Sequence, residues 1–171
     1  MVIPPTEKRA FERFVAESSD RLVRTAYLLC GDRGHAEDLV QTALLRTARR
    51  WGRARRQPEA YARRVVVNLA KDRWRELSRR PREAPIDDAE VAVAVADGVA
   101  ERDVLLRAAQ TLPEGQRAVL VLRYFADLSV EETARTLGCT TGTVKSQTAR
   151  ALTRLRAALT PEMENADADR R

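Results

Sequence analysis

The sequence is poor in the residues that carry most enzyme and metal chemistry. Its 171 residues include one histidine and two cysteines, and aromatic residues make up 5% of the chain. Cys30 and Cys139 lie far apart, which is typical of a reduced cytoplasmic protein, and we expect each to be a small buried apolar residue. His35 lies near Cys30, but the spacing is not that of zinc ligands. The sequence therefore predicts neither a metal centre nor a cofactor.

Long apolar runs are also missing. The longest run of small apolar residues, 91–96, is far too short to span a bilayer. The start of the chain does not have the pattern of a signal peptide. The sequence contains no nucleophile elbow and no glycine-rich phosphate loop. We therefore expect a cytoplasmic protein that is not inserted in a membrane and is not an enzyme.

Positive charge is abundant, and it comes almost entirely from arginine. The chain has 31 basic and 25 acidic side chains, and only three of the basic ones are lysines. Residues 40–82 hold fourteen basic and three acidic side chains, a net charge of +11, whereas residues 83–103 carry −6. A strongly basic segment favours a polyanion such as nucleic acid as a partner. The charge pattern thus predicts a nucleic-acid-binding face followed by an acidic connector.

Apolar residues recur at the three-to-four spacing of amphipathic helices through most of the chain. Residues 31–34 indicate a turn, and a basic loop is expected from Gly52 to Pro58, where the next helix begins. Pro81 and Pro85 interrupt the helical pattern. The short run 91–95 fits a strand or a helix equally well.

These patterns predict an all-α fold of two small helical domains joined by a flexible linker. The second domain has its own apolar stripes, with a helix ending near Leu112 and another starting at Pro113. The expected boundaries are a first domain at 1–78, a linker at 79–100, a second domain at 101–160 and a polar tail at 161–171.

The second domain contains a helix-turn-helix pattern. Ser129 and Glu132 have the spacing of a capping box at a helix start, and Gly138 is placed to end that helix. Thr140 or Thr141 then caps a longer helix. The N-terminal part of the second helix of such a motif enters the major groove of DNA. Its candidate DNA-binding side chains are Thr143, Lys145, Ser146, Gln147, Arg150 and Arg154.

The position of each side chain along this helix suggests whether it contacts bases or phosphates. We expect Lys145 and Gln147 to reach base edges, whereas Ser146, Arg150 and Arg154 suit phosphate contacts. The alternative is an ordinary helical hairpin with a solvated face. A capping box, a glycine turn and a basic face occur together here, which favours DNA binding.

Four stretches of the chain resemble one family of bacterial transcription factors. LPEGQRAVLVLRYFADLSVEETARTLGCTTGTVKS (112–146) and ARALTRLR (149–156) resemble region 4 of the extracytoplasmic-function (ECF) sigma factors, in the sigma-70 superfamily. AEDLVQTALLR (36–46) is similar to sigma region 2.2, and PEAYARRVVVNLAKDRWR (58–75) to regions 2.3 and 2.4. The resemblance covers about 150 residues in the right order. It implies a transcription initiation factor that directs RNA polymerase core to promoters.

The resemblance also implies partners. The helix of residues 37–46 would dock on the clamp helices of the polymerase β′ subunit, with Asp38 and Gln41 at the matching positions. Region 4 would meet the β flap and the −35 element of promoter DNA. An anti-sigma protein is a further partner of many such factors. Without the resemblance, Asp38 and Gln41 would be taken for a solvated helix face.

In this family, region 2 melts the −10 element and captures an unpaired base of the non-template strand. Such a task needs cationic side chains along the strand and polar or aromatic groups for extruded bases. The alternatives are core packing for the two tryptophans and a solvated face for the arginines. The candidates are Trp51, Arg53, Arg55, Arg56, Tyr61, Arg64, Asn68, Lys71, Asp72, Arg73, Trp74 and Arg75.

The sequence departs from the commonest family pattern at two places. Gln147 stands where many relatives carry arginine, which bears on the −35 sequence that is read. Thr42 and Ala43 stand where glutamate and a larger apolar residue are frequent, which bears little on the assignment.

Three other functions compete with this interpretation. A stand-alone helix-turn-helix repressor or activator would not need the basic N-terminal block. An enzyme would have to use Asp32, Glu37 and Asp38 as paired carboxylates, although they lie at a turn and an exposed helix start. An anti-sigma or adaptor protein would not need so large a positive charge in one block.

Overall fold

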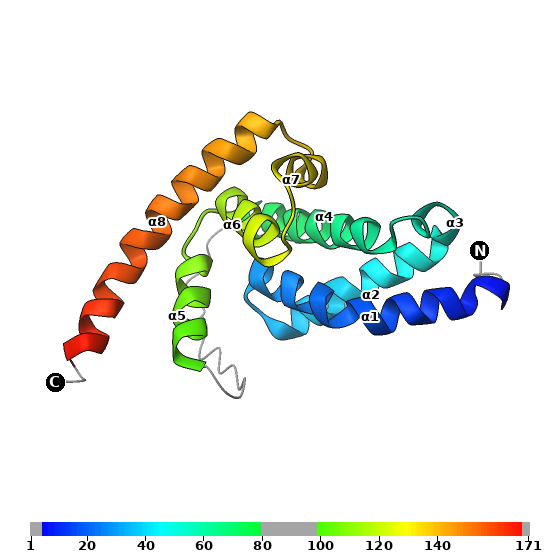
Figure 1. Ribbon diagram of the computed structural model, residues 1–171, viewed down its shortest axis with the longest axis horizontal. Helices are drawn as coiled ribbons and strands as arrows, with labels where there is room; N and C mark the ends of the chain where they lie inside the picture. The colour runs from blue at the N-terminus through cyan, green and yellow to red at the C-terminus, as the bar shows by residue number, and fades with distance from the viewer. Residues whose placement is uncertain (1–4, 80–98, 169–171) are drawn as a thin grey trace.

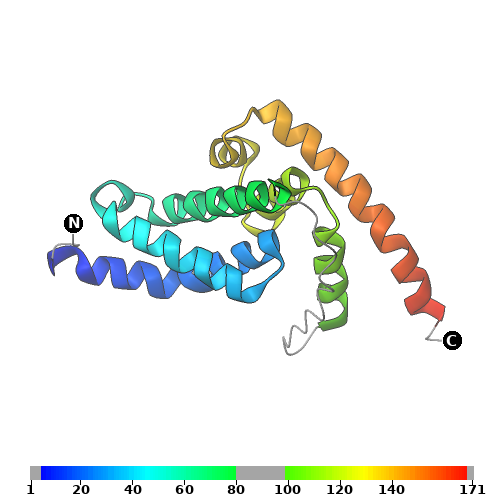
Figure 2. The ribbon, with the colours of Figure 1, turned by 180° about the vertical axis from the view of Figure 1, so that it is seen from behind.

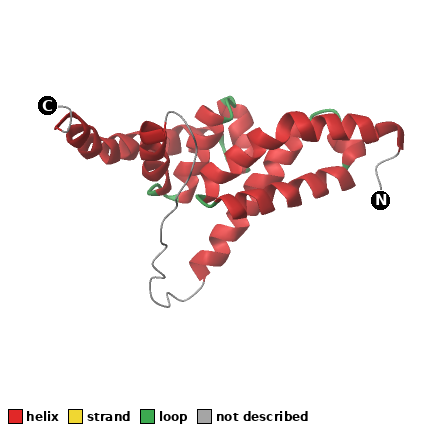
Figure 3. Ribbon diagram, turned by 90° about the horizontal axis from the view of Figure 1, so that it is seen from below, coloured by secondary structure: helices red, strands yellow, loops and turns green. Residues whose placement is uncertain are grey.

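The computed structural model describes residues 5–79 and 99–168, and every regular element in these ranges is a helix (Figure 1, Figure 3). The all-α prediction is therefore confirmed. Most of the predicted linker at 79–100, including the ambiguous run 91–95, lies outside the described residues. The helices are α1 (Pro5–Cys30), α2 (Arg33–Arg49), α3 (Trp51–Ala54), α4 (Pro58–Arg79), α5 (Val99–Gln110), α6 (Glu114–Leu120), the π-helical η1 (Val121–Phe125), α7 (Val130–Leu137) and α8 (Thr141–Ala168).

The N-terminal half is a bundle in which α1, α2 and α4 lie side by side (Figure 1, Figure 2). On α4 the buried residues recur every four positions, as Ala62, Val66, Ala70 and Trp74, so one face of the helix is apolar. The same rule buries Leu22, Ala26 and Leu29 on α1. No helix in the part of the chain that the structure describes is long and apolar enough to cross a membrane.

The basic loop predicted from Gly52 to Pro58 is partly wrong, because Trp51–Ala54 forms the short helix α3. The cause is tertiary packing. The Trp51 ring lies edge-on to Phe11 at 5.1 Å and tilted against Phe14 at 5.8 Å. Burying the indole between these rings of α1 fixes the chain at the point where a loop was expected. Gly34, expected in the preceding turn, likewise lies inside α2.

The C-terminal half contains the predicted helix-turn-helix. Ser129 and Glu132 form a complete capping box at the start of α7. Gly138 ends this helix with a left-handed φ of 68°, which glycine adopts without strain. Of the two candidate caps, it is the Thr140 hydroxyl that accepts a hydrogen bond from the Thr143 amide at the start of α8. The predicted motif is therefore confirmed in its local details.

Two helix ends differ from the prediction. The helix after Pro113 changes from α to π geometry at Val121 and continues to Phe125, a widening that periodicity does not reveal. The last helix was expected to end near residue 160, but α8 runs past Pro161 to Ala168. The residues after this proline include several good helix formers, and the helix continues through them without a break.

The two halves share one apolar core. Leu122 and Leu128 belong to the same buried cluster as Leu22, Val66 and Trp74 of the N-terminal bundle. Both views of the ribbon place α6 and α7 against α4 (Figure 1, Figure 2). Two smaller clusters hold α8, one around Leu120 and Ala151 and one around Val119 and Val144. The DNA-binding candidates of both halves therefore lie on one connected framework.

Candidate nucleic-acid interface

The exposed side of α4 carries a row of polar side chains. Tyr61, Arg64, Asn68, Lys71 and Arg75 follow one another at intervals of three or four residues, opposite the buried face that contains Val66 and Trp74. Arg64, Asn68 and Arg75 are exposed, whereas Tyr61 and Lys71 are half-buried. The row thus presents cations, an amide and a phenol along one edge of the bundle.

A groove of about 540 Å³ adjoins the start of this row. One wall comes from the end of α3 and the start of α4, and the other comes from the segment around α7. Five arginines and a single carboxylate, Glu132, lie among its lining residues. The lining consists of Arg53, Ala54, Arg56, Gln57, Ala60, Tyr61, Arg63, Arg64, Leu128, Glu132, Arg135 and Thr136.

Three of the candidate cations have partners within the chain. Arg55 forms an ion pair with Glu7 at 2.8 Å, and Arg75 pairs with Asp72 at 3.1 Å. The Arg75–Asp72 pair is largely exposed and the Arg55–Glu7 pair partly so, and exposed pairs contribute little to stability. Lys71 donates a hydrogen bond of 2.9 Å from its Nζ atom to the carbonyl oxygen of Leu137, the last residue of α7.

Three other candidates lie elsewhere. Trp51 and Trp74 are 5% and 7% exposed, so neither ring is available to stack on a base in this structure. Their positions match the core-packing alternative. Arg73 lies off the α4 row, near Asp32 and Cys30. Hydrogen bonds from His35, with a small contribution from Arg73, lower the pKa of the Asp32 carboxyl, whereas burial raises the pKa of the Cys30 thiol.

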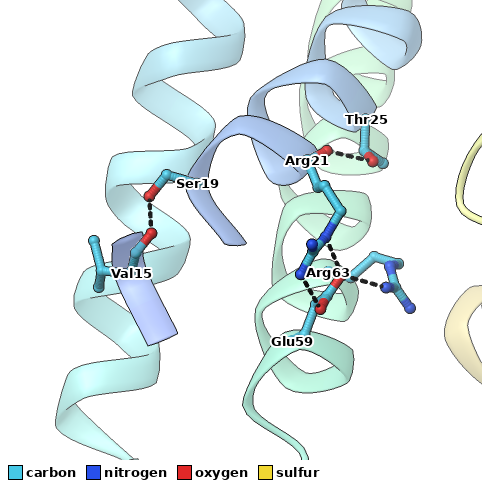
Figure 4. A network of polar contacts seen from close by, with 6 residues as sticks. All are labelled: Val15, Ser19, Arg21, Thr25, Glu59 and Arg63. Atoms are coloured by element: carbon cyan, nitrogen blue, oxygen red, sulfur yellow. Dashed lines mark hydrogen bonds and ion pairs between the residues drawn. The ribbon is translucent and has the colours of Figure 1, made fainter. Parts of the chain in front are cut away.

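An ion-pair network holds the start of α4 against α1 (Figure 4). Glu59 accepts hydrogen bonds from Arg21 of α1 at 2.8 and 3.2 Å and from Arg63 at 3.0 Å. Burial would raise the pKa of the Glu59 carboxyl, but the two arginines outweigh this effect and lower it. The network therefore fixes Arg63 beside the groove.

The recognition-helix candidates lie on the outer side of α8. Val144 and Ala151 are fully buried, whereas Thr143, Ser146, Arg150 and Arg154 are exposed and Gln147 is half-buried. These five residues form one row by their spacing. Lys145 is exposed as well, but its position in the helix places it on the other flank of the exposed face.

On α2, Asp38 and Gln41 are exposed and lie in one row with Leu45. Leu45 is 62% exposed, so an apolar side chain lies at the surface beside the two polar candidates. In the described part of the chain, no group of three or more His, Cys, Asp or Glu side chains is placed to hold a metal ion.

Comparison with known proteins identifies both halves. The family model "Sigma-70 region 2" matches residues 14–80, and the model "Sigma-70, region 4" matches residues 102–155. The chain is 42% identical over 166 residues to the RNA polymerase sigma-E factor of Streptomyces avermitilis, covering 94% of this chain and 89% of that protein.

The chain belongs to the ECF sigma factors of the sigma-70 family. The ECF RNA polymerase sigma factor SigM of Mycobacterium tuberculosis is 34% identical, with 87% of this chain and 76% of that protein covered. The protein is thus an RNA polymerase sigma factor that directs promoter-specific transcription initiation, and it is not an enzyme. The competing repressor, enzyme and anti-sigma interpretations are thereby set aside.

Two solved structures share the fold. The sigma factor RpoE in complex with the anti-sigma factor NepR from Bartonella quintana aligns with a TM-score of 0.74 and 25% identity, covering 88% of this chain and 97% of that chain. CnrH in complex with the cytosolic domain of CnrY aligns with a TM-score of 0.64 and 23% identity, covering 89% and 88% of the two chains.

Several residues of the sigma factor's candidate surfaces escaped the sequence analysis. Arg63 lies in the same basic segment as Arg64, and this charge pattern was the one feature of the sequence that indicated a role for Arg63. Arg135 and Glu132 line the groove only because α7 packs over α4, which no local pattern predicts. Leu45 was not singled out in the sequence.

Proposed function

We propose that the basic groove and the α4 row bind the unpaired non-template strand of the −10 element, and that the outer row of α8 binds the −35 element. The clustering of arginines beside a row that contains Tyr61 and Asn68 carries the first assignment. Cationic side chains suit the phosphates of a single strand, and an aromatic side chain suits its bases.

Within the groove, Arg53, Arg56 and Arg64 are the proposed phosphate contacts. Asn68 is the proposed reader of an extruded base, because its amide both donates and accepts hydrogen bonds. Arg55 and Asp72 have smaller proposed roles, since each is engaged in an ion pair. We leave Trp51, Trp74 and Arg73 out of the proposed surface because of their positions.

On α8, Gln147 and Lys145 are the proposed base readers, whereas Ser146, Arg150 and Arg154 are the proposed phosphate contacts. Thr143 lies in the same row as Ser146, near the N-terminus of α8. In such motifs this end of the helix enters the major groove of DNA. Because Lys145 lies on the opposite flank from Gln147, the two would meet different bases or strands.

The resemblance to the family supports the proposed polymerase contacts. Asp38 and Gln41 are the proposed contacts with the β′ clamp helices, and the exposed Leu45 extends this row. Region 4 is proposed to meet the β flap. We also propose that an anti-sigma protein is a partner and that the protein is located in the cytoplasm. The proposed domain boundaries are 1–78 and 101–160.

The −10 assignment can be tested with Asn68→Ala bound to polymerase core. The template is pre-melted over the −10 element and carries matched or altered non-template bases, with sequences chosen by run-off selection. The variant should lose discrimination between these bases. Ser78→Ala, another exposed polar residue of α4, should keep it. Unchanged base preference in a folded Asn68→Ala protein would mean that other residues form the pocket.

A further inference from the structure

A second cavity, of about 250 Å³, lies where the turn after η1 meets α1 and the start of α4. Part of its lining is apolar, because it includes the buried side chains of Leu22 and Leu28. Another part is the ion-pair network in which Arg21 and Arg63 converge on Glu59 (Figure 4). The cavity is smaller than the sites that hold drug-sized molecules, so it suits a small ligand.

The turn after η1 contributes an aromatic ring to this cavity. Phe125 lines it and is nevertheless 56% exposed. The neighbouring Tyr124 is exposed to a similar degree but does not belong to the lining. Covering an exposed phenyl ring with another apolar group removes apolar surface from water, which is favourable, and two rings gain further from edge or offset contacts. The cavity therefore favours a ligand that has an apolar ring.

Arg24 supplies the cavity with a positive charge that is not neutralised locally. The residue lines the cavity and is exposed, and no hydrogen bond or ion pair engages it within residues 5–79 and 99–168. In contrast, Arg21 and Arg63 are both bonded to Glu59. A guanidinium group can donate two parallel hydrogen bonds to one carboxylate or phosphate. Arg24 is therefore the group best placed to hold the anionic end of a ligand.

The balance of charges in the cavity favours a ligand with a single negative charge. Three arginines and two carboxylates, those of Glu59 and Asp127, line it and leave a net charge of +1. Asp127 has a left-handed φ of 51°, which aspartate adopts more readily than most residues. Because its carboxylate would repel an anion, a dianionic phosphate monoester is less favourable here than a monoanionic carboxylate.

We propose that this cavity binds a small molecule in which one carboxylate is joined to an apolar ring. The carboxylate is held by Arg24 of region 2, and the ring packs on Phe125 of region 4. The cavity shares Arg63 with the basic groove, but the inference does not depend on the proposed role of that groove. Such a site gives the sigma factor a small-molecule ligand in addition to polymerase and DNA.

Phenylacetate is the probe for this site because it carries both chemical features. Acetate lacks the ring and 2-phenylethanol lacks the charge, so these two compounds separate the contributions. The full chain is labelled with ¹⁵N and titrated with each compound, and amide chemical shifts are followed. We expect phenylacetate to bind with a Kd on the order of 1 mM, with the largest shifts around Phe125 and Ala126. Acetate and 2-phenylethanol should bind at least about tenfold more weakly.

Each proposed contact has a matched control variant on the same element. Arg24→Ala should weaken phenylacetate binding about tenfold, whereas Arg13→Ala removes an exposed arginine of α1 outside the cavity and should have no effect. Phe125→Ala should weaken binding about three- to tenfold, whereas Tyr124→Ala should bind as the wild type does. Asp127→Asn keeps a residue that tolerates the left-handed backbone and should tighten binding about two- to fivefold by removing repulsion.

The substituted side chains are exposed, so the variants should fold, and circular dichroism melts check this. Equal binding of phenylacetate by Arg24→Ala and Arg13→Ala, or acetate that binds as tightly as phenylacetate, would overturn the site. Phenyl phosphate that binds more tightly than phenylacetate would overturn the assignment to a monoanion. Asn68→Ala, which tests the −10 assignment, should bind phenylacetate as the wild type does, so the two proposals can fail separately.

Discussion

Trp51 shows how position decides the role of a single residue. In the sequence, an aromatic residue beside several arginines suits base stacking, but the ring is buried against Phe11 and Phe14. Its Nε1 also has no hydrogen-bond partner, so the ring acts through packing alone. Tyr61, which is half-buried and lines the groove, is the better candidate for stacking.

We predict that substitution of Trp51 affects stability, whereas substitution of Tyr61 affects DNA binding. Trp51→Ala should lower the free energy of unfolding by about 3–5 kcal/mol, measured in urea, because it leaves a large cavity. The milder Trp51→Phe should bind single-stranded DNA as the wild type does. Tyr61→Ala should weaken that binding by about 1–3 kcal/mol through loss of one stacked base. A folded Trp51→Phe protein with binding as weak as that of Tyr61→Ala would restore Trp51 to the interface.

Glu59 gives a prediction about pH. Its pKa is lowered in the folded protein, so its ion pairs stabilise the fold fully above its unfolded pKa, about 4.3, and less as the pH falls through the folded value. The carboxylate side chain is 32% exposed, so the contribution should be about 1 kcal/mol or less. Glu59→Gln should therefore be less stable than the wild type at pH 7.

The difference between Glu59→Gln and the wild type should shrink as the pH is lowered below about 4, because the wild-type carboxyl is then protonated as well. Asp20→Asn removes an exposed carboxylate from α1, next to Arg21, and serves as the control. A stability difference that stays constant between pH 7 and pH 3 would show that the charge of Glu59 is not what stabilises the fold.

Among the helices, we expect the proposed recognition helix α8 to use some side chains for base readout and others for general affinity. Gln147→Ala should alter −35 preference by about 1–3 kcal/mol at one base pair. Arg150→Ala should instead weaken binding to every duplex and reduce the slope of log affinity against log salt by about one unit. Fluorescence titrations over a range of salt concentrations would measure both. Unchanged −35 preference in Gln147→Ala would remove that residue from base readout.

The exposed row on α2 predicts how the protein meets polymerase. Leu45→Ser should weaken binding to polymerase core about tenfold, since burying a leucine side chain contributes about 1.5–3 kcal/mol. Leu77→Ser is a matched control, because Leu77 is 49% exposed on α4. Neither change should affect folding much. Equal binding by the two variants in a competition assay would exclude Leu45 from the polymerase interface.

Helix boundaries separate what the sequence can predict from what it cannot. The capping box at Ser129 and the glycine cap at Gly138 depend on neighbouring residues alone, and both were predicted correctly. In contrast, α3 forms because Trp51 packs on rings of α1 about 40 residues away in the chain. No local pattern predicts such a contact, and the π-helical turn after Leu120 left no signature in the periodicity either.

At the scale of the whole molecule, the packing of region 4 against region 2 could not be predicted from the sequence. Both regions were recognisable in the sequence because each has its own motifs, and the four groove arginines of region 2 belong to a charge run. Gln110 and Arg117 resembled ordinary surface residues of helices, yet they contact Leu28 and Leu29, which are 82 and 88 residues away in the chain. Four of the twelve residues that line the groove come from region 4, and this third of the lining could not be predicted because it depends on how the regions pack.

The central claim is that this chain gives RNA polymerase its choice of promoter. Purified core polymerase should be mixed with the full chain and a library of duplex DNA, and the run-off transcripts sequenced. We expect transcripts to start at discrete sites that share −35 and −10 sequences, and to disappear when the chain is omitted. Initiation at the same sites without the chain, or repression of initiation when it is added, would contradict the account.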